Sequence, residues 1–291
     1  MTIKSPCHKL QYGLLVVVFA FLVSIDVAAG QGSRHFEALK LKLVKEGFDE
    51  DRINAAYNHQ SVRFDPASVA FFFVYKEAHL NYDQFAAPRQ IQKARQYMQA
   101  QATNLLKAEK GFGVEKEIIT AIILVETRLG TYTGESRILN TLSTVAALSD
   151  PVSRNKLWVE ISKTKKISRK GFEKKANRKS KWAYAELKAF LRYTADEGMN
   201  PVEVRGSFAG ALGISQFLPS SVLMYGRDGN GDGRINLFEH ADAIASIANY
   251  LKKYGWRPGI DRDRAYKVVW KYNHSKYYVN IVLKVAQLLK G

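Results

Sequence analysis

Glu126 is a lone carboxylate at the end of an apolar run, and its setting is that of an acid that can donate a proton. It directly follows the uninterrupted apolar residues 121–125, and Gly130 lies just beyond it. Packing against such a run removes water from the carboxyl group and disfavours its ionised form, so we expect its pKa to be raised. A carboxyl group with that property can act as a general acid. The alternative is a partly exposed carboxylate that pairs with Arg128 at a helix end.

A second segment, residues 206–221 (GSFAGALGISQFLPSS), alternates glycine with small and polar residues. Glycines at this density let the backbone approach a ligand closely, and Ser207 and Gln216 supply groups that orient sugar hydroxyl and acetamido substituents. The segment does not fit a nucleotide-binding loop, because no strand precedes it and no lysine follows in the phosphate-binding position. Tight packing of helices through glycine is the structural alternative.

Residues 228–239 have the spacing of a calcium-binding loop. Oxygen-bearing side chains stand at alternate positions, and Gly233 stands where the loop must turn sharply. Position 7 needs only a backbone carbonyl, and the carboxylate at position 12 can close the shell with both of its oxygens. A turn without metal is the alternative. We predict a structural Ca²⁺ site with the ligands Asp228, Asn230, Asp232, Arg234, Asn236 and Glu239.

The segment 271–278 (KYNHSKYY) interleaves aromatic rings with polar groups. Aromatic faces stack on sugar rings, and Asn273 can bind an acetamido or hydroxyl group. The same residues would also suit the solvated start of a helix with buried tyrosines. His274 has no evident partner in the sequence, and we expect neither a histidine catalyst nor a zinc site.

The elements that must position these residues are almost wholly helical. Apolar residues recur at intervals of 3.6 residues, and no β-rich sector is present. Glu115 and Glu117 fall in the first turn of the helix that carries Glu126, where negative charge complements the helix dipole. Further helices are expected at residues 36–44, 53–57, 90–110, 182–196, 241–254 and 276–290.

Residues 1–29 are predicted to be an export signal. They contain two lysines, an apolar stretch at 13–25, and small residues at the positions that a signal peptidase reads. The stretch is shorter than the roughly 20 residues that span a bilayer, so an uncleaved membrane anchor is the less favoured interpretation. Cys7, the single cysteine, precedes the stretch and is not placed for lipidation. The exported chain would therefore contain no disulfide bond.

The chain has 291 residues and a net charge of +17, which in an exported protein favours an anionic partner such as cell wall, anionic lipid or nucleic acid. Residues 154–181 hold twelve lysines and arginines against two glutamates. This tract is either a solvated surface insertion or an arm that contacts an anionic polymer or a membrane surface. Blocks of like charge favour the solvated insertion.

In this order, ETRLG (126–130), the glycine-rich segment, the calcium-loop segment and YNHS (272–275) resemble the membrane-bound lytic transglycosylase B family of bacterial peptidoglycan-cleaving enzymes. The likeness runs with interruptions from Phe36 to Leu289. It implies an all-α (mainly α), lysozyme-like catalytic domain at residues 114–291 that includes the calcium loop, with an N-terminal helical extension at 30–113. It also implies that Glu126 is the catalytic residue. The glycan cleft is expected to include Ser207, Phe208, Gln216, Tyr272 and Asn273.

Two local departures from the family pattern concern the cleft. Much of the family has a Tyr-Gly pair where Ile214 and Ser215 stand, so the shape of one subsite is expected to differ. Tyr82 aligns poorly with a cleft tyrosine of the family and is not among the expected site residues. The missing lipidation cysteine suggests a periplasmic or cell-envelope protein that is soluble after signal cleavage. We expect it to be a monomer without an organic cofactor.

The resemblance favours a transglycosylase mechanism. Ordinary glycosidases use two carboxylates, and the motifs supply one, Glu126. This residue would protonate the bond between N-acetylmuramic acid and N-acetylglucosamine of the glycan strand and leave a 1,6-anhydro end. The first alternative is a hydrolytic muramidase in which Glu135 or Asp150 holds a water molecule. The second is a non-catalytic, calcium-stabilised wall-binding protein, and no nucleic-acid partner is expected because the basic tract lacks a recognisable binding module.

Overall fold

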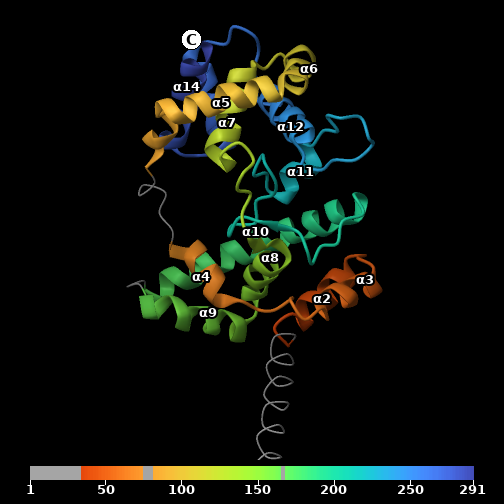
Figure 1. Cartoon of the computed structure of the whole chain (residues 1–291). Coiled ribbons are helices and arrows are strands. Elements are labelled where there is room, and N and C mark those ends of the chain that lie inside the picture. The colour runs from red at the N-terminus through yellow and green to blue at the C-terminus, as the bar shows by residue number, and fades with distance from the viewer. Residues whose placement is uncertain (1–33, 75–80, 165–167) are drawn as a thin grey trace, which may run out of the picture. The chain divides into compact units, whose positions relative to one another are not determined.

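A computed structural model describes residues 34–74, 81–164 and 168–291 of the chain (Figure 1). The chain divides into two compact units, one that ends at Phe64 and one from Asp65 to Gly291. The predicted export signal lies outside the described residues. The domain boundaries expected at residues 29 and 113 stay predictions.

The described part of the first unit is a pair of helices, α2 (Glu37–Lys45) and α3 (Glu50–Tyr57). Asp49 caps α3, since its carboxylate accepts a hydrogen bond from the Arg52 backbone N–H at 2.8 Å. Buried side chains of both helices face each other, and the rings of Phe36 and Tyr57 meet edge to face. The helices expected at 36–44 and 53–57 are therefore present.

The second unit is also mainly α-helical. Its α-helices are α4 (Pro66–Val74), α5 (Pro88–Ala100), α6 (Ala102–Phe112), α7 (Lys116–Thr127), α8 (Ile138–Ala146), α9 (Pro151–Thr164), α10 (Arg169–Asp196), α11 (Pro219–Tyr225), α12 (His240–Lys253), α13 (Arg262–Tyr272) and α14 (Lys276–Lys290). The described residues of this unit also form two short 3₁₀ helices, η2 (Tyr82–Ala86) and η3 (Ala147–Ser149), and two strands, β1 (Ser136–Arg137) and β2 (Arg205–Gly206).

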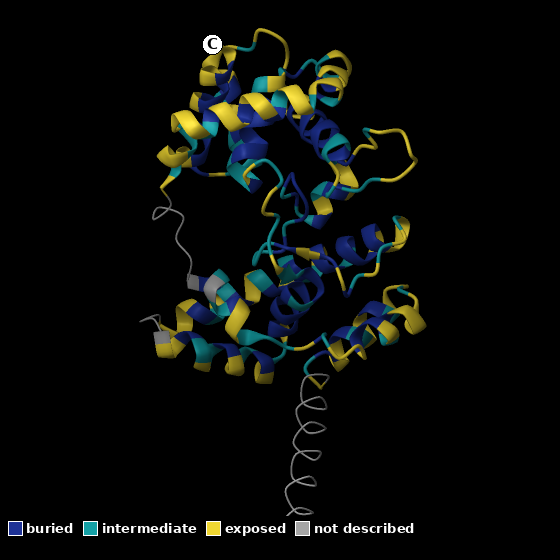
Figure 2. Cartoon of the chain, viewed as in Figure 1, coloured by how far each residue is buried: buried dark blue, intermediate teal, exposed yellow. Residues whose placement is uncertain are grey.

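The helix that carries Glu126, α7, is a core element. It packs against α5, α6, α12 and α14, and Figure 1 shows it beside α5. Every residue from Ile118 to Leu124 is buried, and these turns of α7 are dark blue in Figure 2. A helix that is apolar on all sides is stable only when other elements surround it. This burial fixes the helix whose last turn presents Glu126.

A second group of helices is built around α10. This helix packs against α8, α9 and α11, and α4 packs against α8 and α9. The strands β1 and β2 pair antiparallel, with Ser136 opposite Gly206 and Arg137 opposite Arg205. The short sheet therefore joins the loop that follows α7 to the start of the glycine-rich segment.

The structure differs from the expected helices in two places. The run expected at 90–110 is two helices, because the backbone leaves the helical region at Gln101 between α5 and α6. The helix expected at 182–196 begins at Arg169, so much of the basic tract is regular helix. In the described residues, every helix is too short or too polar to cross a membrane.

Candidate functional site

Glu126 lies in the last turn of α7 and is half-buried, between the buried core of the helix and an abrupt turn. Arg128 and Leu129 both have left-handed backbones, with φ of 51° and 66°, and Gly130 follows with φ of 83°. Two consecutive non-glycine residues in this region are uncommon, and backbone strain of this kind concentrates at functional sites. The turn ends the helix directly after the carboxylate.

Two tyrosines of the YNHS region lie beside Glu126. Burial raises the pKa of Tyr272 well above its usual value, and the Glu126 carboxylate raises it further. Burial also raises the pKa of Tyr278, and the charge of the Glu126 carboxylate raises it further, although the Tyr278 hydroxyl itself has no hydrogen-bond partner among the described residues. The two rings lie nearly parallel with centroids 6.3 Å apart. Both phenols stay neutral near pH 7, so the side of Glu126 that faces them is uncharged and shielded from water.

Sequence reasoning omitted two of the residues at this site. In the sequence, Tyr278 is only one ring of an aromatic run, and the surroundings of Tyr82 align poorly with the family pattern. In the structure, Tyr82 lies close enough to Tyr278 to raise the pKa of that phenol. Tyr82 begins η2, which packs against α14, the helix that carries Tyr278. The clue that could have identified Tyr278 was its place in the first turn of the last expected helix, directly after YNHS.

Thr127 connects the end of α7 to the glycine-rich segment. Its buried hydroxyl lies 3.2 Å from the Ile214 carbonyl oxygen, to which it can donate, and it accepts from the Gly130 N–H at 3.0 Å. Tyr272 reaches the same segment, because its hydroxyl donates to the Ser215 carbonyl at 2.5 Å. Residues 214 and 215 are thus held on two sides, and these contacts bring Glu126, Tyr272 and the glycine-rich segment together.

Gln216 and Ser207, the polar residues expected in the cleft, both have internal hydrogen bonds. The Gln216 amide nitrogen donates to the carbonyls of Thr133 at 3.0 Å and Gly213 at 2.8 Å, so it ties the glycine-rich segment to the loop after α7. The Ser207 hydroxyl oxygen accepts from the backbone N–H groups of Ala209 and Ala211. Both residues therefore shape the glycine-rich segment. The Ser207 O–H and the Gln216 amide oxygen, which these hydrogen bonds do not use, are the groups that a ligand could contact.

Phe208 and Asn273 are half-buried. The ring of Phe208 meets Phe72 of α4 edge to face at 6.4 Å, so it contacts a different helix group from Tyr272. Asn273 is the C-cap residue of α13, and its carbonyl accepts from the Ser275 N–H at 2.8 Å. Asn273 follows Tyr272 directly and therefore belongs to the segment beside Glu126.

The two acids that a hydrolase might use as a partner of Glu126 have different surroundings. Glu135 is exposed, and its backbone carbonyl accepts from the Arg205 guanidinium at 2.8 Å. Asp150 precedes α9, and its carboxylate accepts from the Ser153 N–H at 2.8 Å in the manner of a helix cap. Capping of α9 is sufficient to explain Asp150.

The loop at residues 228–239 is ordered by its own polar side chains. The Asp228 carboxylate accepts from the N–H groups of Gly231 at 2.6 Å and Gly233 at 2.8 Å. These hydrogen bonds lower the pKa of Asp228. The Asn230 amide nitrogen donates to the carboxylates of Asp232 and Glu239, at 3.1 and 3.0 Å. The carboxylates of Asp232 and Glu239 therefore both accept a hydrogen bond from the side-chain amide of Asn230.

The donor set of this loop fits a hard cation. Carboxylate and amide oxygens are the ligands that Ca²⁺ prefers, and the neighbouring Asp242 accepts from the N–H groups of Gly229 and Asn236, which fixes the loop on α12. Burial raises the pKa of Asp242, and the charges of Asp228 and Glu239 raise it further, so negative charge is concentrated here. Among the described residues, no group of three or more His, Cys, Asp or Glu side chains is arranged to hold a metal. The calcium site stays a prediction.

Sequence comparison places the chain among known proteins. The family model described as Transglycosylase SLT domain matches residues 31–265. Membrane-bound lytic murein transglycosylase B of Escherichia coli (strain K12) is 36% identical over 175 residues, which are 60% of this chain and 41% of that protein. The chain therefore spans less than half the length of this relative.

Solved structures share the fold. The Escherichia coli lytic transglycosylase SLT35, in complex with calcium, has a TM-score of 0.68 at 24% identity, and the match covers 90% of this chain and 92% of the other. SltB3 from Pseudomonas aeruginosa, in complex with NAG-anhNAM-pentapeptide, has a TM-score of 0.71 at 19% identity, with 90% and 80% covered. The mainly α, lysozyme-like fold expected from the sequence is confirmed.

Proposed function

The chain belongs to the family of Transglycosylase SLT domains, which confirms the resemblance found in the sequence, and from this premise we propose that it is a lytic transglycosylase of peptidoglycan. One observation carries the proposal. Glu126, at the end of a buried apolar helix, lies beside two neutral tyrosines and next to the glycine-rich segment. Relatives support the substrate, since SltB3 of Pseudomonas aeruginosa was solved with NAG-anhNAM-pentapeptide.

In the proposed reaction Glu126 acts first as acid and then as base. Its protonated carboxyl group donates to the glycosidic oxygen between N-acetylmuramic acid and N-acetylglucosamine, and the bond from that oxygen to C1 of the muramyl sugar breaks. The 2-acetamido group stabilises the cationic centre. The 6-hydroxyl oxygen of the same sugar then bonds to C1, and its proton passes to the Glu126 carboxylate. The product is a 1,6-anhydro end, the acid is regenerated, and no water is consumed.

The tyrosines give this cycle its physical basis. The buried Tyr278 hydroxyl has no hydrogen-bond partner among the described residues and lies near Glu126, so it is proposed to donate to the carboxylate once the first proton transfer has formed it; burial keeps the phenol itself from ionising. The Tyr272 hydroxyl donates a hydrogen bond to the Ser215 carbonyl, so Tyr272 is proposed to position the glycine-rich segment beside Glu126. Gln216, Ser207, Phe208 and Asn273 are proposed to contact the glycan strand.

Calcium is proposed as a structural ion. The side-chain oxygens of Asp228, Asn230, Asp232 and Glu239, with the Arg234 carbonyl and Asn236, would hold it, and SLT35 with calcium supports this assignment. The ion would neutralise the clustered acids of the loop and supplies no chemistry to the cleft. We also propose that the protein acts in the periplasm or cell envelope as a monomer, after removal of residues 1–29.

Digestion of purified peptidoglycan sacculi tests the proposed reaction. Wild-type protein should release fragments that mass spectrometry identifies as 1,6-anhydro-muramyl products. Glu126→Gln keeps the shape of the side chain but cannot donate the proton, so activity should fall by at least about a hundredfold with unchanged thermal unfolding. Glu135→Gln and Asp150→Asn are matched controls that should stay active.

The same digest separates the alternatives. Reducing muramyl ends, together with inactivity of Glu135→Gln or Asp150→Asn, would establish a hydrolytic muramidase and refute the single-acid mechanism. Binding to sacculi without release of any soluble fragment would indicate a calcium-stabilised wall-binding protein. The structure favours the transglycosylase over the muramidase, because Asp150 caps α9 and Glu135 is exposed.

A further inference from the structure

The basic tract carries a ladder of cations along one side of α10. Lys170, Lys174, Arg178 and Lys181 are all exposed, at spacings of four, four and three residues. At about 100° per residue these spacings keep the four side chains within one face of the helix. The buried Phe172, Ala176 and Ala183 lie on the opposite face, which packs into the unit. The four residues, called here the α10 ladder, therefore point to solvent together.

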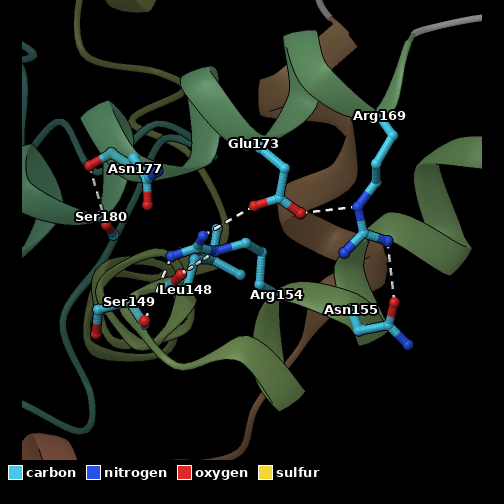
Figure 3. A network of polar contacts seen from close by, with 8 residues as sticks. All are labelled: Leu148, Ser149, Arg154, Asn155, Arg169, Glu173, Asn177 and Ser180. Atoms are coloured by element: carbon cyan, nitrogen blue, oxygen red, sulfur yellow. Dashed lines mark hydrogen bonds and ion pairs between the residues drawn. The ribbon is translucent and has the colours of Figure 1, made fainter.

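Other cations of the tract have partners inside the protein. Figure 3 shows the Glu173 carboxylate between two arginines, Arg154 at 2.8 Å and Arg169 at 2.7 Å. The hydrogen bond from Arg154 lowers the pKa of Glu173, so this acid stays ionised and committed to the network. Lys163 pairs with Glu160 at 3.0 Å. Both glutamates of the tract are thus paired away from the ladder.

Two further lysines of α10 are turned toward α4. The Lys175 ammonium donates to the Phe73 carbonyl, and the Lys179 ammonium lies 3.2 Å from the ring centroid of Phe72. Burial lowers the pKa of Lys175, and the charge of Arg178 adds to this effect. Burial, together with the charges of Lys175 and Arg178, lowers the pKa of Lys179 to about 8. Within the described residues no carboxylate pairs with any member of the ladder. The ladder is therefore a concentration of unneutralised positive charge.

We propose that the α10 ladder binds a linear polyanion that carries a phosphate or carboxylate in each repeat. Neighbouring residues of the α10 ladder, three or four positions apart, have Cβ atoms about 5–6 Å from each other. The whole ladder extends over roughly 16 Å at 1.5 Å per residue. Regularly spaced negative charges on an extended polymer can pair with several cations of the α10 ladder at once, and each contact releases a counterion.

A polymer fits this face better than a lipid bilayer does. Helices that lie in a membrane interface bury an apolar face between the headgroups, with lysines at its margin. On α10 none of the described large apolar side chains is exposed, and the opposite face of the helix is already committed to the core. The ladder therefore offers charge alone, which is what a hydrated polyanion requires.

Binding measurements with a charge-matched control test this proposal. One variant combines Lys170→Gln, Lys174→Gln, Arg178→Gln and Lys181→Gln. The control combines Lys93→Gln, Lys107→Gln, Lys253→Gln and Lys267→Gln, which are exposed lysines on α5, α6, α12 and α13. Both variants lose four charges, so only the location differs. The probes are long-chain inorganic polyphosphate, poly-L-glutamate, and vesicles of equal parts phosphatidylcholine and phosphatidylglycerol.

The ladder variant should lose roughly 30-fold or more in affinity for a polymer at low salt, and the slope of log K against log salt should decrease by about three. The control should retain most of the affinity. Which of the two polymers binds identifies phosphate or carboxylate as the preferred anion. Equal losses in both variants would attribute binding to net charge and overturn the proposal, as would vesicle binding that needs the ladder while neither polymer binds. These assays need no turnover, so they stand apart from the test of the proposed catalytic function.

Discussion

At the scale of single residues, the Tyr278 hydroxyl is the group whose loss should be most informative. Tyr278→Phe removes the buried hydroxyl that is proposed to donate to the ionised Glu126 carboxylate, and it leaves the ring packing intact. A hydrogen bond to a charged group contributes about 1.5–3 kcal/mol, so kcat should fall roughly 10- to 100-fold. Without this donor the carboxylate is less stable, so the acid form persists to higher pH, and the alkaline limb of the pH–rate profile should move upward.

Tyr277→Phe is the matched control for this prediction. Tyr277 is the neighbouring residue but is 48% exposed, so removal of its hydroxyl should change neither kcat nor the pH profile. An unshifted profile in Tyr278→Phe, with full activity, would mean that the phenol does not act on Glu126.

Sequence could find Glu126 but not all of its neighbours. A single acid after five apolar residues is a local signal, because the sequence itself shows what the carboxyl group packs against. Tyr278 and Tyr82 act on the site from α14 and η2, which meet only in the folded unit. No local pattern distinguishes Tyr82 from the other tyrosines of the chain, and for Tyr278 the one local clue is its place in the first turn of the helix after YNHS. Their role depends on how helices pack, and that information is spread over the whole unit.

At the scale of elements, the junction between α7 and the glycine-rich segment depends on the buried hydroxyl of Thr127. Thr127→Val preserves the shape of the side chain but leaves the Ile214 carbonyl and the Gly130 N–H without this partner. An unsatisfied buried group costs about 1–3 kcal/mol, so the free energy of unfolding should decrease by that amount. Activity should also fall, because the end of α7 that carries Glu126 loses its side-chain hydrogen bond to Ile214.

Thr127→Ser provides the test of this explanation, since it restores the hydroxyl. It should recover most of the activity that Thr127→Val loses, as measured on the same glycan substrate. Equal kcat in the valine and serine variants would show that the hydroxyl does not position Glu126, even if both variants are less stable than the wild type.

Gly213 is the second element-scale junction, because its backbone touches the calcium-loop segment. Its φ is +62°, and a Cβ there would lie well under 3.0 Å from the Leu237 carbonyl oxygen. The matched control is Gly259, which has φ of +68° but open space where a methyl group would stand. Gly259→Ala should cost about 1–2 kcal/mol from the left-handed backbone alone. Gly213→Ala should cost at least about 1–3 kcal/mol more, because the backbones must separate.

Chemical denaturation of the two alanine variants measures this difference directly. Equal destabilisation of the two variants would mean that the backbones at Gly213 and Leu237 can separate without loss of stability. Glycine would then be required at position 213 for its backbone angles alone.

The elements that sequence predicted well are those with strong apolar periodicity. The helices at 241–254 and 276–290 correspond closely to α12 and α14, whose buried faces are mostly apolar. The first half of α10 was not predicted, because its buried face is marked only by Phe172, Ala176 and Ser180 among many charges. That stretch is helical because α4 and α9 supply the aromatic rings and the ion pairs that cover it. Tertiary contacts of this kind leave little trace in local composition.

At the scale of the whole molecule, the calcium loop should couple ion binding to the stability of the second unit. The loop is attached to α10 by the Glu197 carboxylate, which accepts from the Ile235 N–H, and to α12 by Asp242. Its Leu237 carbonyl accepts from the Ile214 N–H of the glycine-rich segment at 2.8 Å. An ion that orders the loop therefore supports the helices on both sides of it and the segment beside Glu126.

Calcium removal should consequently lower the melting temperature. With the weak affinity typical of extracellular sites, about 10 mM Ca²⁺ should stabilise the folded state by about 1–3 kcal/mol, and EGTA should lower Tm by roughly 3–9 °C. Asp228→Asn and Glu239→Gln should abolish the difference between the two conditions. Asp261→Asn is the matched control, because Asp261 is an exposed helix-capping carboxylate on α13, away from the loop. The Asp261→Asn variant should keep the full difference in Tm between calcium and EGTA. If that difference survives in Glu239→Gln, the ion binds elsewhere and the loop is a metal-free turn.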